Sequence, residues 1–392
     1  MVVKPLRARA IALFHEAFAA TPRAAASAPG RVHLLGEHTH YNGGPVLLIA
    51  TRERTAVAVG PGEAGVLEVV AGADGQRERV RFGDGRPQSW AGYAAAVMHE
   101  LGPLGAAPAN GGARVAVSSD LPAGAGFASS AALAVAAAGA LTALAGARLT
   151  TRQLAGVAFR AEHDHVGARC GVMDHAIAAL ARPGRALLVE CASAEGRLVP
   201  FGGGLLLVDA GARPDEAARL LEQRQAECEA AVARLKLELP ELYWLASWPA
   251  GWLARLKKAL REPLRSRAVH IVGETARARF GAELLARRRL ERFGELLYES
   301  HESSRRLYDW SAPEADLVVT AAKRAGALGA RLTGFRGFGT VLVLLRKGDD
   351  GKGKRAGKIA ETIRSAFAKA YRREPGIRVL LSGGGARREA VR

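Results

Sequence analysis

Residues 28–44 read APGRVHLLGEHTHYNGG, and the interpretation of the whole chain starts from this stretch. It places an arginine, a glutamate, three histidines and an asparagine between glycines, directly before the strand-like run 45–50. So many hydrogen-bonding side chains are too polar for a core and too many for a plain connection. The stretch therefore predicts a site for a small polyhydroxylated ligand, with Arg31 available to bind an anion.

A second informative stretch, residues 118–132, reads SSDLPAGAGFASSAA and follows the strand-like run 113–117. Its glycines let the backbone approach a ligand closely, and the first N–H groups of the Ala-rich helix expected behind it point into the loop. Such a loop favours a phosphate group. By itself, a glycine-rich turn is equally well explained as a simple connection from strand to helix.

A third stretch, residues 161–175, reads AEHDHVGARCGVMDH and concentrates carboxylates and histidines. His163 and His165 flank Asp164, which suggests a transition-metal site. However, alternating positions on a helix point to different faces, so these two histidines are poorly placed to share one ion.

In this order, the three stretches resemble the sugar signature, the phosphate-binding loop and the carboxylate segment of galactokinases, which belong to the GHMP family of small-molecule kinases. Similar strings in the second half extend the resemblance over about residues 10–345. The resemblance implies a two-domain α+β fold with the active site between the domains. Residues 1–200 would form the N-terminal domain, with a mixed sheet and the phosphate loop, and residues 201–392 a ferredoxin-like C-terminal domain.

The resemblance also implies ATP as co-substrate and Mg²⁺ as cofactor. Mg²⁺ would bind the Ser130 hydroxyl and the Glu162 carboxylate, because this hard cation prefers oxygen ligands. The residues assigned to ATP are Pro122, Gly124, Ala125, Gly126, Phe127, Ala128, Ser129 and Ser130.

For the sugar, the resemblance assigns Asp174 as catalytic base near the anomeric hydroxyl. Arg31 would hold Asp174 ionised and stabilise the charge that develops on the transferred group. The residues assigned to sugar binding are Glu37, His38, His40, Gly171 and Leu221.

Several positions depart from the family pattern and leave the identity of the sugar open. His40 stands where the family has an aspartate that contacts galactose, and Leu221 where it has a tyrosine that contacts the same sugar. Hydrogen bonds to charged groups are worth about 1.5 to 3 kcal/mol each. Losing two such contacts predicts one to several decades weaker binding, unless His40 substitutes for the aspartate.

Other departures concern the neighbourhood of the phosphate groups. His175 replaces the glutamine that usually follows the catalytic aspartate, and His33 replaces an asparagine. The third family glycine loop reads TGFRGFG at residues 333–339, so Phe335 and Arg336 replace two glycines. Arg336 either adds a cation beside the nucleotide or is solvated.

The resemblance thus implies ATP-dependent phosphorylation of the anomeric hydroxyl of galactose or a related sugar. The alternative is a catalytically silent sensor of sugar or nucleotide on the same scaffold, which His40, Leu221 and the altered third loop suggest. The enzyme is favoured because a sensor has no need to keep an arginine, a base and a metal ligand together.

Composition and charge narrow the class of protein further. The 392 residues, 49% hydrophobic and 24% charged, predict a globular chain of two domains. The net charge of +18 suggests nucleic-acid binding, but the basic residues are dispersed and aromatics amount to only 6%, so we expect no specific nucleic-acid partner.

Targeting signals and cysteines point to the cytoplasm. The apolar run 131–147 predicts a packed core helix rather than a membrane span, and no secretory signal is recognised at residues 1–20. The three cysteines are widely spaced and fit a reducing compartment. We therefore expect a cytoplasmic monomer that binds a sugar and ATP and no membrane.

Overall fold

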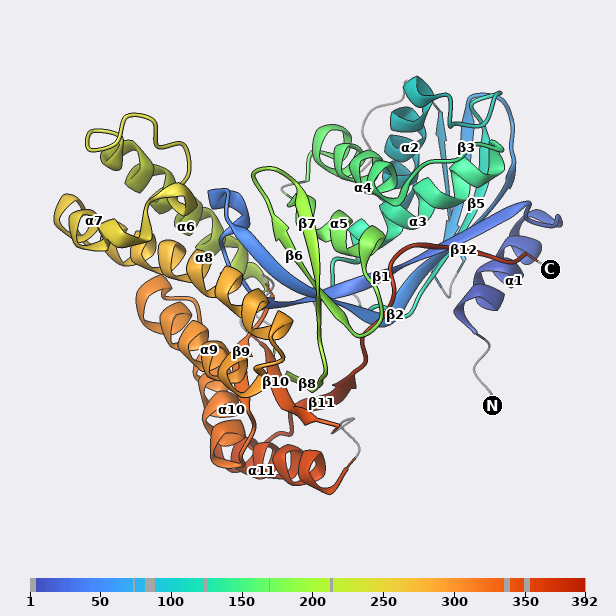
Figure 1. Ribbon diagram of the computed structural model, residues 1–392. Helices are drawn as coiled ribbons and strands as arrows, with labels where there is room; N and C mark the ends of the chain where they lie inside the picture. The colour runs from blue at the N-terminus through green and yellow to red at the C-terminus, as the bar shows by residue number, and fades with distance from the viewer. Residues whose placement is uncertain are drawn as a thin grey trace.

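The computed structural model describes residues 5–72, 75–81, 89–122, 126–168, 170–211, 214–334, 339–348 and 353–391. Two sheets organise these residues (Figure 1). The strands of the first sheet are β1 (Ala24–Leu35), β2 (Pro45–Pro61), β3 (Val66–Ala71), β4 (Gln76–Arg81), β5 (Ala113–Ser119), β6 (Arg185–Glu190), β7 (Glu195–Pro200) and β12 (Arg387–Glu389). Those of the second are β8 (Gly203–Asp209), β9 (Gly329–Leu332), β10 (Thr340–Lys347) and β11 (Gly376–Leu380).

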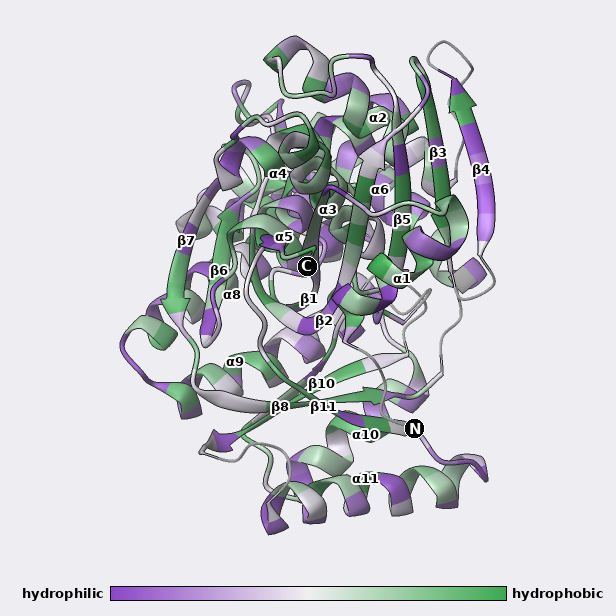
Figure 2. Ribbon diagram, turned by 90° about the vertical axis from the view of Figure 1, so that its right-hand side faces the viewer, coloured by the Kyte–Doolittle hydropathy of each residue, from purple (hydrophilic) through white to green (hydrophobic). Residues whose placement is uncertain are grey.

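The long strand β2 holds the first sheet together. It pairs with β1 along most of its length, with β6 through its first residues and with β5 through its last. All described pairings in this sheet are antiparallel except that of β3 with β5, so the sheet is mixed, as the resemblance implied. Its edge strand β4 reads QRERVR and is hydrophilic along almost its whole length (Figure 2). A charged edge strand discourages pairing with another chain.

Helices cover the faces of the first sheet. They are α1 (Leu6–Phe18), α2 (Trp90–Leu101), α3 (Ser129–Leu144), α4 (Thr151–Arg160) and α5 (Val172–Leu180), with the 3₁₀ turns η1 (His40–Asn42) and η2 (Gly102–Leu104) and the π-helical segment η3 (Ala161–Val166).

Helix α3 is the central helix of this half. Every residue from Ala131 to Thr142 is buried, and the helix packs against β1, β2, α2, α4 and α5. Its small side chains allow close approach, since a Cβ on Gly139 would lie 3.2 Å from Cβ of Ala26. The predicted packed core helix is thus confirmed. In the described parts of the chain, no helix combines the length and the apolar character that crossing a membrane requires.

The second sheet has the order β11-β8-β10-β9 and is antiparallel throughout. Helices pack beside it and extend from it (Figure 1). They are α6 (Pro214–Leu235), α7 (Leu253–Ala259), α8 (Leu264–Ala286), α9 (Leu290–Ser303), α10 (Pro313–Arg324) and α11 (Lys354–Tyr371), with the short segments η4 (Leu245–Ser247), η5 (Ala250–Trp252) and η6 (Ser304–Tyr308). The two halves together form the α+β architecture that the resemblance implied.

The chain passes from the first sheet to the second between β7 and β8, close to the expected domain boundary at residue 200. The C-terminal tail then returns. Ser382 forms a bridge with Thr51, and β12 pairs with residues Ala25 to Ser27 of β1. The last described residues therefore add a strand to the first sheet (Figure 1). A simple division of the chain at residue 200 does not include this return of the C-terminal tail.

Candidate active site

The signature stretch forms the end of β1 and the loop into β2. Gly36 has φ +90°, and a Cβ at this position would lie 2.4 Å from the Pro45 carbonyl oxygen, so the turn requires glycine. The buried Glu274 carboxylate of α8 accepts the N–H of Gly36 at 3.0 Å and the Ser300 hydroxyl at 2.7 Å. A helix of the second half thus anchors the signature loop.

The Glu274 carboxylate that anchors the loop is ionised. Burial opposes ionisation of Glu274, but the guanidinium groups of Arg277 and Arg331 outweigh it and lower the pKa of Glu274 to about 2. Arg277 donates to the carboxylate at 2.7 Å. Glu274 therefore remains ionised at neutral pH and keeps accepting hydrogen bonds from the loop.

Arg31 and Asp174 form a buried, two-pronged ion pair. Nε of Arg31 donates to Oδ1 of Asp174 at 2.6 Å, and Nη2 donates to Oδ2 at 2.9 Å. Arg31 lies in β1 and Asp174 in the first turn of α5. Burial of Asp174 opposes its ionisation, yet the Arg31 guanidinium prevails and lowers the pKa of Asp174 below its ordinary value. The expected contact between these two residues is present.

Arg31 also contacts the phosphate loop. Its Nη1 donates to the carbonyl oxygen of Gly126, and its backbone N–H donates to that of Phe127 at 3.0 Å. One side chain therefore joins Asp174 to the described end of the loop. The distance between loop and base is within the reach of a triphosphate, as the predicted reaction requires.

The end of the phosphate loop leads directly into α3. Ser129 and Ser130 are its first residues, and Ala128 precedes them in a left-handed conformation with φ +53°. An alanine side chain cannot cap the first N–H groups of a helix, so these groups remain available to an anion. Pro122 precedes the loop, while Gly124 and Ala125 lie outside the described residues.

The third glycine loop approaches the same place. A Cβ added to Gly126 would lie 4.0 Å from Cα of Gly334, and the Thr333 hydroxyl donates to the His33 carbonyl oxygen at 2.9 Å. Residues 335–338, which include Phe335 and Arg336, lie outside the described residues. The described part of this loop therefore borders the phosphate loop.

Glu162, the expected magnesium ligand, lies in η3 and is buried. Segment η3 packs against α3, whose first turn contains Ser130. Oε2 of Glu162 lies 2.8 Å from Nε2 of His175, the residue that departs from the family pattern. A buried carboxylate and a hydroxyl beside an exposed helix N-terminus are the kind of donors that magnesium bound to a nucleotide takes.

A large cavity of about 1140 Å³ opens between the two halves. His40 and Gly171 line it from the first half, and Cys228, Tyr243 and Trp244 line it from the second. A site of this volume accommodates a small ligand. Two of the predicted sugar-binding residues thus share one cavity next to Asp174, because the Gly171 carbonyl oxygen accepts the N–H of Asp174 at 3.3 Å.

Position 171 also requires glycine for packing. A Cβ there would lie 2.1 Å from Sδ of Met173 and 3.1 Å from Cδ2 of His40. The absence of a side chain therefore lets His40 lie directly against the backbone that leads to Asp174.

His40 is neutral in this setting. Burial, together with the positive potential of His33, lowers the pKa of His40 to about 3, although Asp174 and Glu37 act in the opposite direction. A neutral imidazole still offers one N–H donor and one acceptor. The lowered pKa favours the neutral imidazole near neutral pH.

The structure does not bring the other three predicted sugar-binding residues to the cavity wall. Glu37 is 1% exposed, and its Oε2 accepts from Nη2 of Arg331 at 2.9 Å. His38 is fully buried, with its Nδ1 3.0 Å from the Tyr41 hydroxyl. Leu221 of α6 packs, partly buried, against the apolar core of the second half. Glu37 and His38 therefore support the signature loop from its buried side.

Sequence reasoning did not single out the residues that surround His38. Its ring packs against Trp310 and Tyr308, with centroids 4.4 and 4.5 Å away. The Tyr308 hydroxyl lies 2.8 Å from the Tyr41 hydroxyl and 3.2 Å from Sγ of Cys228. Tyr41 could have been identified from its position inside the signature stretch. Tyr308 and Trp310 lie in no sequence motif that would single them out.

The two histidines beside Asp164 lie apart, as their alternating positions predicted. His163 pairs with Asp164 and lines the cavity, whereas His165 contacts Glu100 of α2. They share no contact that would hold one ion between them.

Family models match this chain in three segments. The model described as "Galactokinase galactose-binding signature" matches residues 12–61, "GHMP kinases N terminal domain" residues 91–182 and "GHMP kinases C terminal" residues 282–369. These segments contain Arg31, Asp174 and Arg331 in turn.

Relatives and solved structures agree with that assignment. A galactokinase of Roseiflexus sp. (strain RS-1) is 37% identical over 364 residues, which cover 91% of this chain and 90% of the relative. A galactokinase of Mycobacterium tuberculosis (strain H37Rv) is 38% identical, covering 89% of this chain and 95% of the relative.

Among solved structures, Lactococcus lactis galactokinase complexed with galactose superposes with a TM-score of 0.86 at 22% identity, covering 97% of this chain and 99% of that one. Methanococcus jannaschii mevalonate kinase superposes with a TM-score of 0.60 at 17% identity, covering 92% of this chain and 98% of that one. The fold is therefore that of the GHMP kinases, and the chain belongs to the galactokinase family.

Proposed function

We propose that this chain transfers the γ-phosphoryl group of ATP to the anomeric hydroxyl of galactose or a related sugar, giving the sugar 1-phosphate and ADP. Its family makes it an ATP-dependent sugar kinase. The observation that carries the assignment of the site is the double engagement of Arg31, which binds Asp174 and the end of the phosphate loop at once.

The nucleotide site in this proposal is the loop from Pro122 to Ser130. Phosphoryl transfer depends on positioning and on neutralising charge more than on covalent chemistry with the protein. The N–H groups at the start of α3 bind phosphate oxygens, and Ser130 and Glu162 hold Mg²⁺. The ion supplies neutralisation of negative charge on the phosphate groups.

Asp174 accepts the proton of the anomeric hydroxyl in this proposal. Its lowered pKa keeps it ionised but makes it a weak base before the reaction begins. The transition state of phosphoryl transfer is loose in most analyses, so the hydroxyl becomes acidic only late, when the new O–P bond forms. Asp174 therefore orients the hydroxyl first and takes its proton as the bond closes, while Arg31 faces the transferred group.

For the sugar, we propose that His40 and Gly171 contact hydroxyl groups in the cavity and that Glu37 and His38 act by holding the loop. Nothing in the geometry or in the relatives favours a silent sensor. We further propose that the protein is a monomer in the cytoplasm, without specific nucleic-acid binding. Its three cysteines are free and two of them are only partly buried, which fits a reducing compartment.

The direct test is Asp174→Asn. General-base catalysis typically contributes 10²- to 10⁴-fold, so we expect kcat, measured by ADP release with galactose, to fall by about that factor. ATP affinity, measured by calorimetry, stays within about twofold. Asp164→Asn is the matched control, because Asp164 is exposed and lies in the neighbouring segment. If Asp174→Asn keeps substantial turnover, the assignment of the base is wrong.

A further inference from the structure

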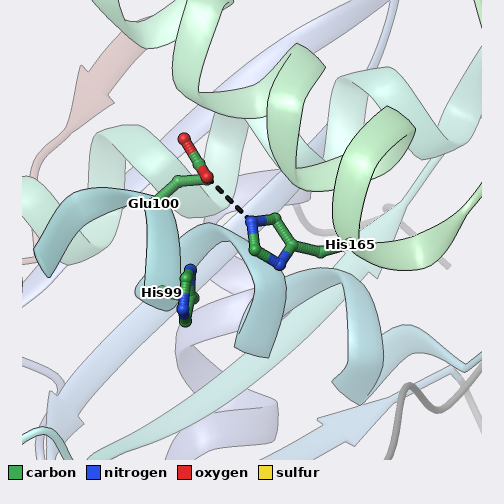
Figure 3. A group of neighbouring side chains, drawn as sticks. All are labelled: His99, Glu100 and His165. Atoms are coloured by element: carbon green, nitrogen blue, oxygen red, sulfur yellow. Dashed lines mark hydrogen bonds and ion pairs between the residues drawn. The ribbon is translucent and has the colours of Figure 1, made fainter.

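A second group of metal-ligating side chains lies outside the candidate active site. His99 and Glu100 stand at the end of α2, and His165 stands in η3 (Figure 3). One ligand atom from each residue lies within 4.8 Å of the other two. Nε2 of His165 is 2.8 Å from Oε1 of Glu100, and the two imidazole rings have centroids 4.4 Å apart.

We propose that His99, Glu100 and His165 form a binding site for a divalent transition-metal ion of the Zn²⁺ class. Two imidazoles and one carboxylate are a donor set that zinc takes in proteins, with a water molecule in the fourth position. Zinc bonds of about 2.0–2.1 Å place neighbouring donors roughly 3.3 Å apart in a tetrahedral site. The observed separations, 2.8 Å between His165 and Glu100 and at most 4.8 Å within the group, lie on either side of that distance.

The surroundings of Glu100 fit this role. Nε of Arg160 donates to Oε2 of Glu100 at 2.5 Å, which leaves Oε1 directed at His165. A hydrogen bond to the second oxygen of a ligating carboxylate fixes its orientation. The group contains a single carboxylate, which disfavours Mg²⁺ and Ca²⁺ because these ions need several oxygen ligands. Neutral imidazoles favour the softer transition metals.

Access and location make the site distinct from the catalytic centre. His99 is exposed, so an ion reaches the group from solvent. An ion there would connect α2 to η3, and η3 also carries Glu162. Because η3 is π-helical, its conformation depends on neighbouring contacts more than that of a regular helix. Metal binding would therefore restrain the segment that presents Glu162.

The test must separate this site from a second group. Glu162, Cys170 and His175 also have ligand atoms within 4.8 Å of one another, and they belong to the proposed phosphate site. Cobalt distinguishes the two, because a thiolate ligand gives a charge-transfer band that imidazole and carboxylate ligands do not. The experiment therefore uses Co²⁺ spectroscopy beside Zn²⁺ calorimetry, on protein treated with a chelator and in the absence of nucleotide.

We expect the wild type to bind Zn²⁺ at a site that His99→Ala and His165→Ala each weaken by at least about tenfold. Cys170→Ala leaves this binding unchanged and is titrated beside the wild type. His163→Ala is the matched control, since His163 lies in the same segment but pairs with Asp164. Zn²⁺ should also slow hydrogen exchange of residues 161–168 in the wild type and not in His99→Ala.

Two results would overturn the proposal. One is Zn²⁺ affinity that His99→Ala does not alter, in a variant whose melting curve without metal matches that of the wild type. The other is a wild-type Co²⁺ spectrum dominated by a thiolate band, together with loss of Co²⁺ and Zn²⁺ binding in Cys170→Ala, which would place the bound ion at the second group. His99 is exposed, so His99→Ala is expected to fold even if His165→Ala does not.

Discussion

The Arg31 side chain has two partners in the structure, Asp174 and the Gly126 carbonyl, and this makes its removal informative. Arg31→Met removes the largest influence that opposes the effect of burial on Asp174, so the pKa of that carboxyl rises. We expect kcat to fall by about 10²- to 10³-fold, the usual effect of losing a group that stabilises transition-state charge. The acid limb of the pH–rate profile should move to higher pH. Arg31→Lys should recover only part of the activity, because an ammonium group cannot donate in a two-pronged geometry.

The control for Arg31 is Arg279→Met, which removes an exposed ion pair with Glu190. Its kinetics should match those of the wild type. If the pH–rate profile of Arg31→Met keeps the acid limb of the wild type, Arg31 does not set the ionisation of Asp174.

We propose that His40 influences how strongly this protein prefers galactose. His40→Asp would restore a family residue in a cavity where a neutral imidazole now stands. A hydrogen bond to a charged group is worth about 1.5 to 3 kcal/mol, so we expect the KM for galactose to fall by roughly 10- to 100-fold. Steady-state kinetics on galactose, N-acetylgalactosamine, galacturonate and arabinose would show the change.

His40→Gln is the matched control, because it keeps a neutral donor and acceptor. If the wild type already has an ordinary KM for galactose, between roughly 1 μM and 1 mM, and His40→Asp gives no gain, the substitution is neutral. There would then be no reason to expect that His40 changes the sugar specificity.

At the scale of single residues, the sequence predicted the chemical roles of the side chains better than their exposure to solvent. Arg31 and Asp174 meet as the family resemblance implied. Glu37 and His38 were expected in the sugar site, but they are buried because Arg331 and Trp310 cover them. Those partners lie almost 300 residues further along the chain, so no local pattern could reveal them.

Among the elements, α8 contributes a charge that links stability to pH. Glu274 has a pKa of about 2 in the folded protein, against an ordinary pKa of 4.5 for a glutamate side chain. A lowered carboxyl pKa adds stability that is complete above the higher value and is lost as pH falls through the lower one. We therefore expect the wild type to lose stability progressively between about pH 5 and pH 2 through this group.

Glu274→Gln isolates that contribution. The difference in free energy of unfolding between wild type and variant should be about 3 kcal/mol at pH 7 and should shrink towards zero near pH 2. Chemical denaturation at several pH values measures it. Glu295→Gln, which alters an exposed ion pair, is the control. A difference that does not vary with pH would contradict the role of Glu274 as a charged anchor.

Element prediction succeeded where the pattern was long and regular. The Ala-rich run forms α3, and the strand-like run 113–117 lies in β5. The π-helical turn of η3 was not foreseen, since a single widened turn leaves no periodicity in the sequence. Its conformation reflects the packing of α2, α3 and α4 around it.

For the whole molecule, the returning tail is a testable source of stability. The guanidinium of the buried Arg54 donates to the carbonyl oxygens of Gly384 and Gly385 at 2.7 and 2.8 Å. Deleting residues 383–392 would leave part of this buried charge without partners. We expect the deletion to lower the free energy of unfolding by at least about 2 to 3 kcal/mol, measured by denaturant titration.

A double-mutant cycle tests the cause. In an Arg54→Ala background no buried guanidinium remains, so the same deletion should cost clearly less. Equal losses in both backgrounds would mean that the tail acts by other contacts, such as that of the Ser27 hydroxyl with Glu389 at 2.6 Å.

The motifs predicted the two halves and their sheets because each motif marks a site that the family fold builds. They did not predict the return of the tail. Strand β12 consists of Arg387, Arg388 and Glu389, and three charged residues carry no strand signal. These residues form a strand only because they pair with β1.

That arrangement also sets an order of events during synthesis. The ribosome produces β1 to β7 first, yet the strand that closes their sheet emerges only after roughly 190 further residues, or roughly 10 to 40 s later at usual rates. Until then the outer edge of β1 and the Arg54 guanidinium have no tail to bind. The nascent N-terminal half must therefore wait for the last residues of the chain before it is complete.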